Sequence, residues 1–497
     1  MVLFLIVIFF LLSATLNVPG GIGKNNDWWP MFRHDLAHSG FSTADTPETK
    51  IVSWTFTTED YVYSSPTVVD GKVYVGSDDG RMYCLDADMG TEFWNFSTGD
   101  WADSTPAYFD GKIYFGSVDK NVYCVDSEDG SEIWRFATED WVYSSPAIID
   151  GMVYIGSWDC NVYCLDAYDG FQIWNFTTDD HVFSSPAIFD GKVYIGSDDR
   201  NLYCLNAGNG SLIWSFTTGD WVWSSPAVCD GKVYFGSGDY NVYCVDAFDG
   251  TEIWNFITDD WVDSSPAVYD DKVYIGSYDD YVYCLDADVG TEIWKFNTEY
   301  YVDSSPAVCD GKVYIGSWNG KVYCLNAYDG YEIWNHHTVG EVRSSPTVSN
   351  GKVYIGSGDS KVYCFGDEVV NHRPKTPKIN GPISGSIGIE YEYVFNSEDP
   401  DFDEIYFYIK WGDGHIEIWD GPHASGQDVN ISHIYEREGA FTIEAKSKDY
   451  KGLESEWSTL NVTIPRNHVF IFKFNLFDWL SKLFPNQFQI LRYLLGF

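Results

Sequence analysis

Through most of the chain, apolar residues fall into short runs separated by Gly and Asp. In one copy, Ser-Ser-Pro-Thr-Val-Val (64–69) enters an Asp70-Gly71 turn and Lys-Val-Tyr-Val-Gly leaves it. A third run spans 82–86 and, after a turn at Gly90, a fourth spans 92–96. An Asp-Gly pair between apolar runs is a strong hairpin signal, since both turn positions need a positive φ. The runs are rich in β-branched and aromatic residues, which favours strands over stacked helical repeats.

The four runs recur with a period of 40 residues, without insertion or deletion. The fixed positions run from Trp54 to Trp334, from Pro66 to Pro346 and from Cys84 to Cys364. Such a period with four strands is typical of a β-propeller blade. Each run occurs eight times, but the first Trp run precedes the first Ser-Ser-Pro run, and the last copy lacks a Trp run. We therefore predict an all-β chain with an eight-bladed propeller at 51–366. Residues 51–58 close it by supplying the outer strand of the blade at 344–366.

The repeat Ser-Ser-Pro-Ala-Val-x-Asp-Gly-Lys-Val-Tyr-x-Gly-Ser, followed by Leu-Asp-Ala-x-x-Gly-x-x-Ile-Trp, resembles that of pyrroloquinoline-quinone-type (PQQ-like) propellers. The resemblance implies a tryptophan-docking motif at Asp166, Gly170, Trp174 and their equivalents. It extends to a lead-in segment (20–50) that contains Asp27-Trp-Trp-Pro-Met-Phe-Arg-His. The family includes quinoprotein dehydrogenases and non-enzymatic scaffolds such as the lipoprotein of the bacterial barrel-assembly machine. Fold resemblance does not choose between them.

Several sequence features favour a protein that is not an enzyme. Many quinoprotein dehydrogenases carry two adjacent cysteines, and this chain has no such pair. The exact period leaves no insertion to roof a quinone, and no His-Glu-x-x-His motif or P-loop is present. We therefore predict a binding or scaffold protein without PQQ. A quinone- and calcium-dependent oxidoreductase remains the alternative.

The 497 residues carry a formal net charge of −44. A surface of this sign repels nucleic acid and favours cations, basic partners or neutral ligands. Solubility in an extracellular or salty medium is the alternative explanation. The eight periodic cysteines occupy equivalent strand positions, too far apart for disulfides, and are predicted to be buried core residues and not metal ligands.

The two ends of the chain differ from the repeats. Residues 1–19 form an apolar run of signal-peptide length without a basic start, which predicts export or an N-terminal membrane anchor, and hence an extracellular or cell-surface protein. Residues 465–497 have amphipathic helical spacing around Pro485. This tail could contact a membrane surface, dock on a partner or pack on the preceding domain.

After a linker at 367–376, residues 377–464 resemble a polycystic-kidney-disease-type (PKD-like) Ig-like β-sandwich. The motifs that carry the resemblance are Asp399-Pro-Asp401, Trp411-Gly-Asp-Gly414, His433-x-Tyr435, Gly439-x-Phe-Thr and Asp449-x-x-Gly452. Asp399, Asp401 and Asp403 are candidate calcium ligands. The loop lacks the Gly and Glu of an EF-hand, so a solvated acidic turn is the alternative.

In a propeller, the loops between blades share a face with the turn between the second and third strands of each blade. These loops carry acid–aromatic pairs, and the turn position equivalent to Asp78 varies between copies. The predicted ligand-binding residues are Asp60, Tyr61, Asp100, Trp101, Asp140, Trp141, Asp180, His181, Asp220, Trp221, Asp260, Trp261 and Tyr301. Aromatic faces beside carboxylates suit an extracellular glycan, a basic peptide or a protein partner. Alternatively, the aromatics only fill the space between blades of a monomeric propeller.

Overall fold

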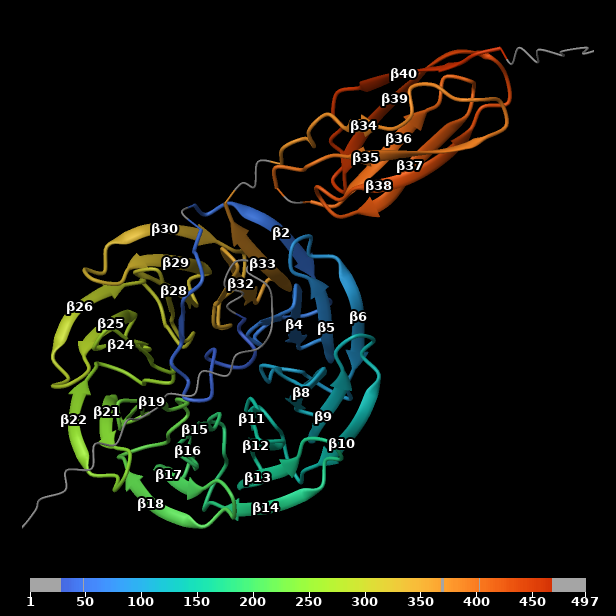
Figure 1. Cartoon of the computed structure of the whole chain (residues 1–497). Helices are drawn as coiled ribbons and strands as arrows, with labels where there is room; N and C mark the ends of the chain where they lie inside the picture. Colours follow the sequence, from blue (N-terminus) through green and yellow to red (C-terminus); the bar gives the residue numbers. More distant parts are fainter. Residues whose placement is uncertain (1–27, 48, 368–370, 402, 467–497) are drawn as a thin grey trace, which may run out of the picture. The chain divides into compact units, whose positions relative to one another are not determined.

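A computed structural model describes residues 28–47, 49–367, 371–401 and 403–466. The chain divides into two compact units, residues 1–368 and 369–497, and each is described by itself. Residues 28–367 form eight sheets around a central axis (Figure 1), seven with four strands and one with a fifth strand from the lead-in segment, which confirms the predicted propeller. The predicted signal or anchor segment and most of the amphipathic tail lie outside the described residues. Among the described residues, no helix is long and apolar enough to cross a membrane.

Within each blade, four antiparallel strands follow one another from the axis outward. The first four blades are β3 (Thr67–Val69), β4 (Lys72–Ser77), β5 (Arg81–Asp86), β6 (Glu92–Ser97); β7 (Ala107–Phe109), β8 (Lys112–Ser117), β9 (Asn121–Asp126), β10 (Glu132–Ala137); β11 (Ala147–Ile149), β12 (Met152–Ser157), β13 (Asn161–Asp166), β14 (Gln172–Thr177); β15 (Ala187–Phe189), β16 (Lys192–Gly196), β17 (Asn201–Asn206), β18 (Leu212–Thr217). The next three are β19 (Ala227–Cys229), β20 (Lys232–Gly236), β21 (Asn241–Asp246), β22 (Glu252–Ile257); β23 (Ala267–Tyr269), β24 (Lys272–Gly276), β25 (Tyr281–Asp286), β26 (Glu292–Asn297); β27 (Ala307–Cys309), β28 (Lys312–Ser317), β29 (Lys321–Asn326), β30 (Glu332–His337).

The eighth blade joins the two ends of the ring. Its inner strands are β31 (Thr347–Ser349), β32 (Lys352–Ser357) and β33 (Lys361–Gly366), and its outer strand is β2 (Val52–Thr57) from the start of the repeats. Trp54 lies opposite Cys364 in this antiparallel pair. The predicted closure by residues 51–58 is therefore confirmed.

The hairpin turns have the predicted backbone, with φ of 51° at Asp70 and 73° at Gly71. The innermost strand is shorter than the predicted run of 64–69 and begins at Thr67. Two causes shorten it. Pro66 has no N–H to donate to a ladder. The Ser64 hydroxyl donates to Ser104 O and the Ser65 N–H donates to Thr105 Oγ1, so both bond to the neighbouring blade instead.

Each periodic tryptophan packs against the next blade. Trp134 covers Gly170, where an added Cβ would lie 2.7 Å from the indole, and its Nε1 donates to Ala167 O at 3.0 Å. Gly170 has a φ of 72°, so glycine serves both the turn and the close approach. The eight docked tryptophans are only 7–9% exposed. The periodic cysteines are buried and form no disulfide among the described residues, as predicted.

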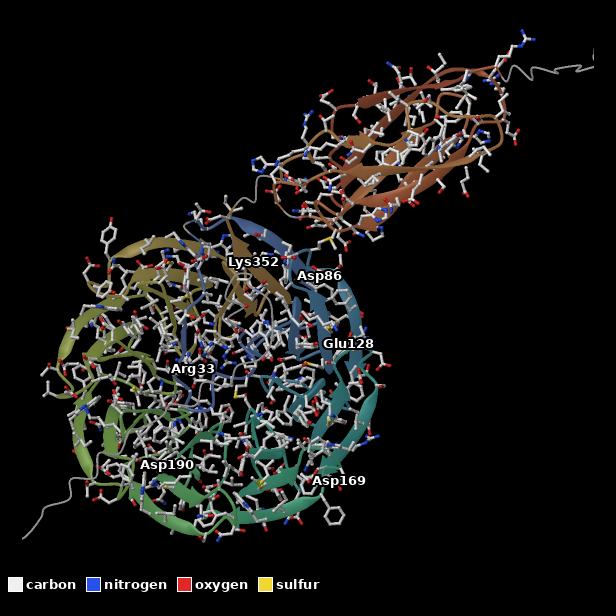
Figure 2. The ribbon with its side chains drawn as sticks, in the orientation of Figure 1. Arg33, Asp86, Glu128, Asp169, Asp190 and Lys352 are labelled. Carbon is white, nitrogen blue, oxygen red and sulfur yellow. The ribbon has the colours of Figure 1, made fainter. Side chains whose placement is uncertain are left out.

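The lead-in segment crosses the inner strands of successive blades. Trp29 exchanges backbone hydrogen bonds with Val68, and the carbonyls of Pro30, Leu36, Ala37 and Ser39 accept from Tyr108, Ile188, Val228 and Val268. β1 (Phe41–Ser42) then pairs in parallel with β27. Figure 2 shows Arg33 of this segment near the middle of the ring. The lead-in segment therefore ties six blades together at one end of the axis.

The second unit is a sandwich of two sheets, as predicted. The sheets are β34 (Lys378–Asn380), β35 (Glu390–Asn396) and β38 (Val429–Ile434) against β37 (Ile416–His423), β36 (Ile405–Lys410), β39 (Gly439–Asp449) and β40 (Ser458–Ile464). Its core contains Tyr393, Phe407, Trp411, Tyr435 and Ile443, each fully buried. Trp411, from the Trp-Gly-Asp-Gly motif, therefore has a packing role.

Candidate functional site

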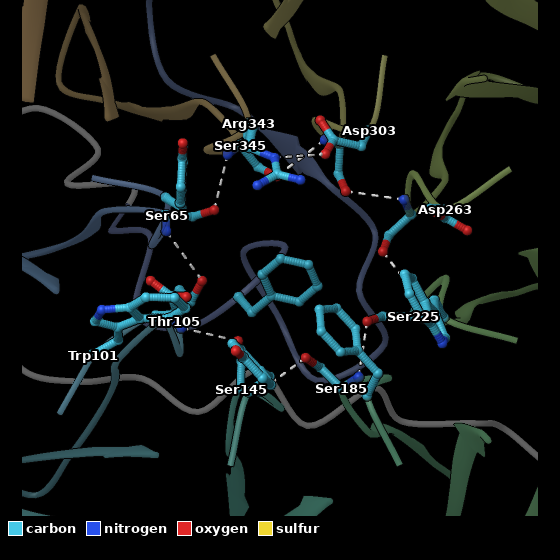
Figure 3. A pocket seen from close by; sticks show the side chains of 18 of the residues that line it. Ser65, Trp101, Thr105, Ser145, Ser185, Ser225, Asp263, Asp303, Arg343 and Ser345 are labelled. Atoms are coloured by element: carbon cyan, nitrogen blue, oxygen red, sulfur yellow. Dashed lines mark hydrogen bonds and ion pairs between the residues drawn. The ribbon is translucent and has the colours of Figure 1, made fainter. Parts of the chain in front are cut away.

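A closed ring of hydrogen bonds lines the channel along the propeller axis (Figure 3). At each blade, the backbone N–H of the second residue of the Ser-Ser-Pro run donates to the side-chain hydroxyl of the equivalent residue in the next blade. The donors and acceptors follow the order Ser65, Thr105, Ser145, Ser185, Ser225, Ser265, Ser305, Ser345 and again Ser65, at 2.9–3.3 Å. The ring satisfies inner backbone donors and fixes the radius of the channel.

The lead-in segment closes the channel on one side of this ring. Arg33 is fully buried and Nη1 donates to Pro306 O, while His38 Nδ1 lies 3.1 Å from Pro226 O. Burial lowers the pKa of Arg33 to about 9 and that of His38 to about 4. Phe32 of the same segment lines the remaining space. The channel is therefore a pocket whose floor is made by residues from the lead-in segment.

The pocket above this floor has a volume of about 580 Å³. That is within the usual range of small-ligand sites, about 300–1,000 Å³. Its wall is formed by the residue that precedes the Ser-Ser-Pro run in each copy: Tyr63, Asp103, Tyr143, Phe183, Trp223, Asp263, Asp303 and Arg343. These eight positions are not among those predicted from the sequence. Variation between otherwise similar copies, the signal used for the Asp78 position, would have found them.

Aromatic side chains cover one side of the wall. Phe183 stacks on Tyr143 at 5.2 Å and on Trp223 at 5.1 Å between ring centroids. Trp158 lies 5.5 Å from the Tyr143 ring and also lines the pocket. Stacked rings of this kind present a continuous π surface to a ligand.

Carboxyl groups occupy the other side of the wall. Burial, with a hydrogen bond and repulsion from Asp103, raises the pKa of Asp78 to about 9, and burial also raises the pKa of Asp103. Burial raises the pKa of Asp263 to about 7, against a 3.3 Å hydrogen bond from Trp221 Nε1. Among the described residues, the Oδ1 atoms of Asp78, Asp103 and Asp303 are buried without a hydrogen-bond partner. The three side chains line the pocket, and their Oδ1 atoms themselves are buried.

Arg343 is the one cation among the described residues that line the pocket. Its Nε donates to Asp303 Oδ2 at 3.3 Å. The guanidinium lies over the rings of Trp318 at 4.2 Å and Tyr63 at 4.9 Å. Asp303 still has a raised pKa, because burial outweighs the attraction of Arg343. One arginine therefore faces five aspartates: Asp60, Asp78, Asp103, Asp263 and Asp303.

The structure places the predicted loop residues at the open end of the pocket. Ala102 N and Asp78 N bond to Ser77 O and Tyr61 O, so the inter-blade loops and the turns share a face as expected. Of the predicted set, Asp60, Tyr61 and Trp101 line the pocket. Trp101, Trp141 and Trp261 are 37–43% exposed, unlike the docked tryptophans. The others surround the rim: Asp100, Asp140, Asp180, His181, Asp220, Trp221, Asp260 and Tyr301.

The predicted calcium ligands come together in the sandwich. Oxygens of Asp399, Asp401 and Asp403 lie within 4.8 Å of one another. Asp399 Oδ1 accepts from the N–H groups of Asp401 (2.8 Å) and Asp403 (3.3 Å), and Asp399 Oδ2 is buried without a partner in the described residues. His372 and Lys451 contact Asp401 and Asp403. The arrangement fits a weak oxygen site for Ca²⁺, with the His372 imidazole and the Lys451 ammonium competing for two of its carboxylates.

The pocket residues do not fit pyrroloquinoline quinone. That group carries three carboxylates, whereas the lining presents five aspartates and one arginine. Several anions in one low-dielectric site repel one another strongly. The quinone- and calcium-dependent alternative therefore lacks a matching cradle in this pocket.

Comparisons with known proteins place the propeller among solved relatives. Residues 36–246 match the family described as the beta-propeller of beta-alanine-activating enzyme, and residues 278–368 match the family described as outer membrane protein assembly factor BamB. No curated protein sequence matches the chain.

Solved structures with the same architecture include an outer-membrane assembly factor and dehydrogenases. BamB from Moraxella catarrhalis is 19% identical, with a TM-score of 0.56 over 65% of this chain and 99% of that one. A europium-containing methanol dehydrogenase is 13% identical (TM-score 0.61; 68% and 98% covered). The quinohemoprotein alcohol dehydrogenase from Comamonas testosteroni is 14% identical (TM-score 0.60; 72% and 83% covered). At these identities the likeness establishes the fold and not an activity. The propeller of this chain thus resembles the PQQ-type propellers in fold, an architecture that it shares with BamB and with these dehydrogenases.

Proposed function

We propose that the chain is a non-catalytic, exported binding protein whose propeller pocket receives a lysine or arginine side chain of a protein partner. The observation that carries the proposal is the set of carboxyl groups of Asp78, Asp103 and Asp303 that line the pocket, each with a buried Oδ1 that has no hydrogen-bond partner among the described residues. A buried acceptor without a partner costs free energy, of the order of 1–3 kcal/mol, unless a ligand satisfies it. An ammonium or guanidinium group supplies both the missing hydrogen bonds and the missing charge.

The aromatic side of the wall supports the same ligand class. A cation placed over the face of Trp, Tyr or Phe within about 6 Å of the ring is attracted by the ring quadrupole. Arg343 already lies this way over Trp318, at 4.2 Å. The stacked Tyr143, Phe183 and Trp223 offer further faces to the methylene stem and head group of an incoming side chain.

The shape of the pocket favours insertion of a side chain over binding of an extended polymer. The lead-in segment closes one end, so a ligand enters from the rim formed by the inter-blade loops. A volume of about 580 Å³ holds one or two long side chains. The net charge of −44 would attract a basic partner at long range. Export fits the N-terminal apolar run, and the BamB match supports a protein partner in general terms.

The direct test is fluorescence anisotropy with labelled lysine- and arginine-containing peptides, and with neutral and acidic peptides of matched length. We expect binding of the basic peptides alone, and Asp103→Asn to weaken it about tenfold or more. Asp100→Asn is the matched control, because this carboxylate lies at the rim in the same loop and outside the pocket lining. Binding of neutral oligosaccharides without basic peptides would instead favour the glycan hypothesis. Reduction of the protein by an alcohol in the presence of quinone and Ca²⁺ would favour the enzyme.

A further inference from the structure

One inter-blade loop differs from the other seven in its chemistry. The position after the loop acid is Tyr, Trp or Glu in the other copies, and in the fourth it is His181. Side-chain atoms of Asp180, His181 and Asp198 lie within 4.8 Å of one another. Asp180 and His181 come from the loop before β15, whereas Asp198 comes from the turn after β16. Two separate segments therefore bring an imidazole and two carboxylates to one point of the rim.

The distances in this group are longer than those of typical hydrogen bonds. His181 Nδ1 lies 3.4 Å from Asp180 Oδ1 and 3.5 Å from Asp198 Oδ2. Hydrogen bonds from N–H to O are typically 2.7–3.2 Å long. Ligand atoms around a tetrahedral metal ion with bonds of about 2.1 Å are separated by about 3.4 Å. The two separations therefore match the edges of a metal coordination tetrahedron.

A similar group in the sandwich provides a contrast. His433 Nε2 lies 2.8 Å from Asp413 Oδ2, and His415 Nδ1 lies 3.2 Å from Asp413 Oδ1. Both distances are within the hydrogen-bond range, so Asp413 is satisfied by its neighbours. The His181 ring has no such short contact to either carboxylate.

Neighbouring aromatic residues hold the three side chains in place. Trp223 Nε1 donates to Asp198 Oδ1 at 2.5 Å, which leaves Oδ2 facing His181. Trp158 stacks on the His181 ring at 4.7 Å, with an interplanar angle of 16°. The N–H of His181 donates to Asp180 Oδ1 at 2.9 Å. Such outer contacts orient metal ligands and often change metal affinity by about 10- to 100-fold.

From this geometry we infer that Asp180, His181 and Asp198 form a binding site for a divalent first-row metal ion, with Zn²⁺ as the best match. Imidazole nitrogen and carboxylate oxygen are both accepted Zn²⁺ ligands. The side chains of Asp180 and His181 are 53% and 39% exposed, so an ion can reach them from solvent. Three protein ligands leave a fourth position open, toward the rim of the propeller. Its three ligands are not among the residues that line the carboxylate pocket, although Trp158 and Trp223 contact both sites.

The test is isothermal titration of Zn²⁺ into the full chain and into variants, together with anomalous diffraction at the zinc edge. We expect one Zn²⁺ equivalent to be lost in His181→Trp and in Asp198→Asn. His181→Trp places at this loop the residue of four other copies, so it keeps the fold. Asp260→Asn is the matched control, since it removes the equivalent acid from a loop without histidine.

The expected result is an anomalous peak between Asp180, His181 and Asp198, with unchanged titration in Asp260→Asn. Titration of His415→Ala distinguishes Zn²⁺ binding at Asp180, His181 and Asp198 from any weaker Zn²⁺ binding at the sandwich. Unchanged stoichiometry in both His181→Trp and Asp198→Asn, or a peak only at other residues, would overturn the inference. Basic-peptide binding that survives His181→Trp leaves the pocket proposal intact, so the two proposals fail independently.

Discussion

The backbone N–H of Ser345 donates to Ser65 Oγ at 2.9 Å and joins residues 280 positions apart in the chain. This bond completes the inner hydrogen-bonded ring, and the pairing of β2 with β33 completes the outer wall of the same blade. The propeller is thus closed twice, by hydroxyl groups at the axis and by a strand at the outer edge of the eighth blade. Because both closures are non-local, the ring depends on its first and last repeats being present together.

Deletion of residues 51–58 should destabilise the propeller far more than removal of residues 377–497. Trp54 packs on Gly90 and its Nε1 donates to Ala87 O at 3.1 Å. Burying one tryptophan hides about 150–250 Å², a gross contribution of about 4–6 kcal/mol. Thermal melting of both truncations checks this. Equal melting temperatures would contradict closure by β2.

The period of 40 residues was enough to predict the blades, their number and their closure, because each blade uses the same turn and docking chemistry. It could not predict the floor of the pocket. Arg33 and His38 are polar residues that a sequence assigns to the surface. Their burial depends on the carbonyls of Pro306 and Pro226, far away in the chain. The wall residues at position 63 and its equivalents vary between copies within an exact period, so the sequence marks the variation but not the pocket that these residues line.

The pair of carboxyl groups at Asp78 and Asp103 should make stability depend on pH. The pKa of Asp78 is about 9 in the folded state, above its value of about 4 in an unfolded chain. The stability that this group contributes is complete below pH 4 and is lost as pH rises through 9. Asp103→Asn removes the neighbouring carboxyl group and should make the loss of stability with rising pH smaller. We expect the variant to gain melting temperature over wild type by about 2 °C or more between pH 7 and 9.5.

The comparison with wild type isolates this pair from other titrating groups, such as the buried cysteines, whose pKa values are also raised. Asp100→Asn is the control, and its melting temperature should follow the wild-type profile. Parallel profiles for Asp103→Asn and wild type would show that the pair does not share a proton.

Calcium should stabilise the sandwich weakly through Asp399, Asp401 and Asp403. Extracellular modules bind Ca²⁺ with Kd of about 10⁻⁴–10⁻³ M, and His372 and Lys451 compete for two of these carboxylates. At ten times Kd, the free energy of unfolding should rise by about 1.4 kcal/mol. Chemical denaturation followed by sandwich fluorescence, with and without Ca²⁺, measures the effect. Asp399→Asn should abolish it, and persistence of the shift in that variant would exclude this site.

Trp101→Ala should weaken binding of a basic peptide with little loss of stability. The side chain lines the pocket and is 43% exposed, so its removal leaves no buried cavity. Trp261→Ala is the matched control, because Trp261 is 38% exposed and lies outside the lining. Trp134→Ala, at a docked position, should cost about 3–5 kcal/mol of stability instead. A loss of several degrees in Trp101→Ala without any change in affinity would make the rim aromatics structural.

Arg343→Met should lower the stability of the propeller and raise its affinity for a cationic ligand. The Arg343 guanidinium offsets part of the negative charge of Asp303 and covers the Trp318 ring. It therefore occupies both an acid and an aromatic face that a cationic ligand would use. Removing it leaves Asp303 buried without its partner. The loss of stability should stay below the roughly 3–5 kcal/mol of a broken buried pair, because protonation of Asp303 relieves the charge.

The same variant should bind a lysine-containing peptide more tightly, by about threefold or more, since one competing cation is gone and the pocket is more negative. Arg135→Met is the control: this arginine lies on an outer strand, pairs with Glu132 at 3.0 Å and is 56% exposed, so neither quantity should change. Anisotropy titrations and melting curves of the two variants measure both effects. Two results would show that Arg343 recognises an anion and that the pocket does not bind cations. One is weaker binding of the basic peptide by Arg343→Met than by wild type, and the other is tighter binding of an acidic peptide by wild type than by Arg343→Met.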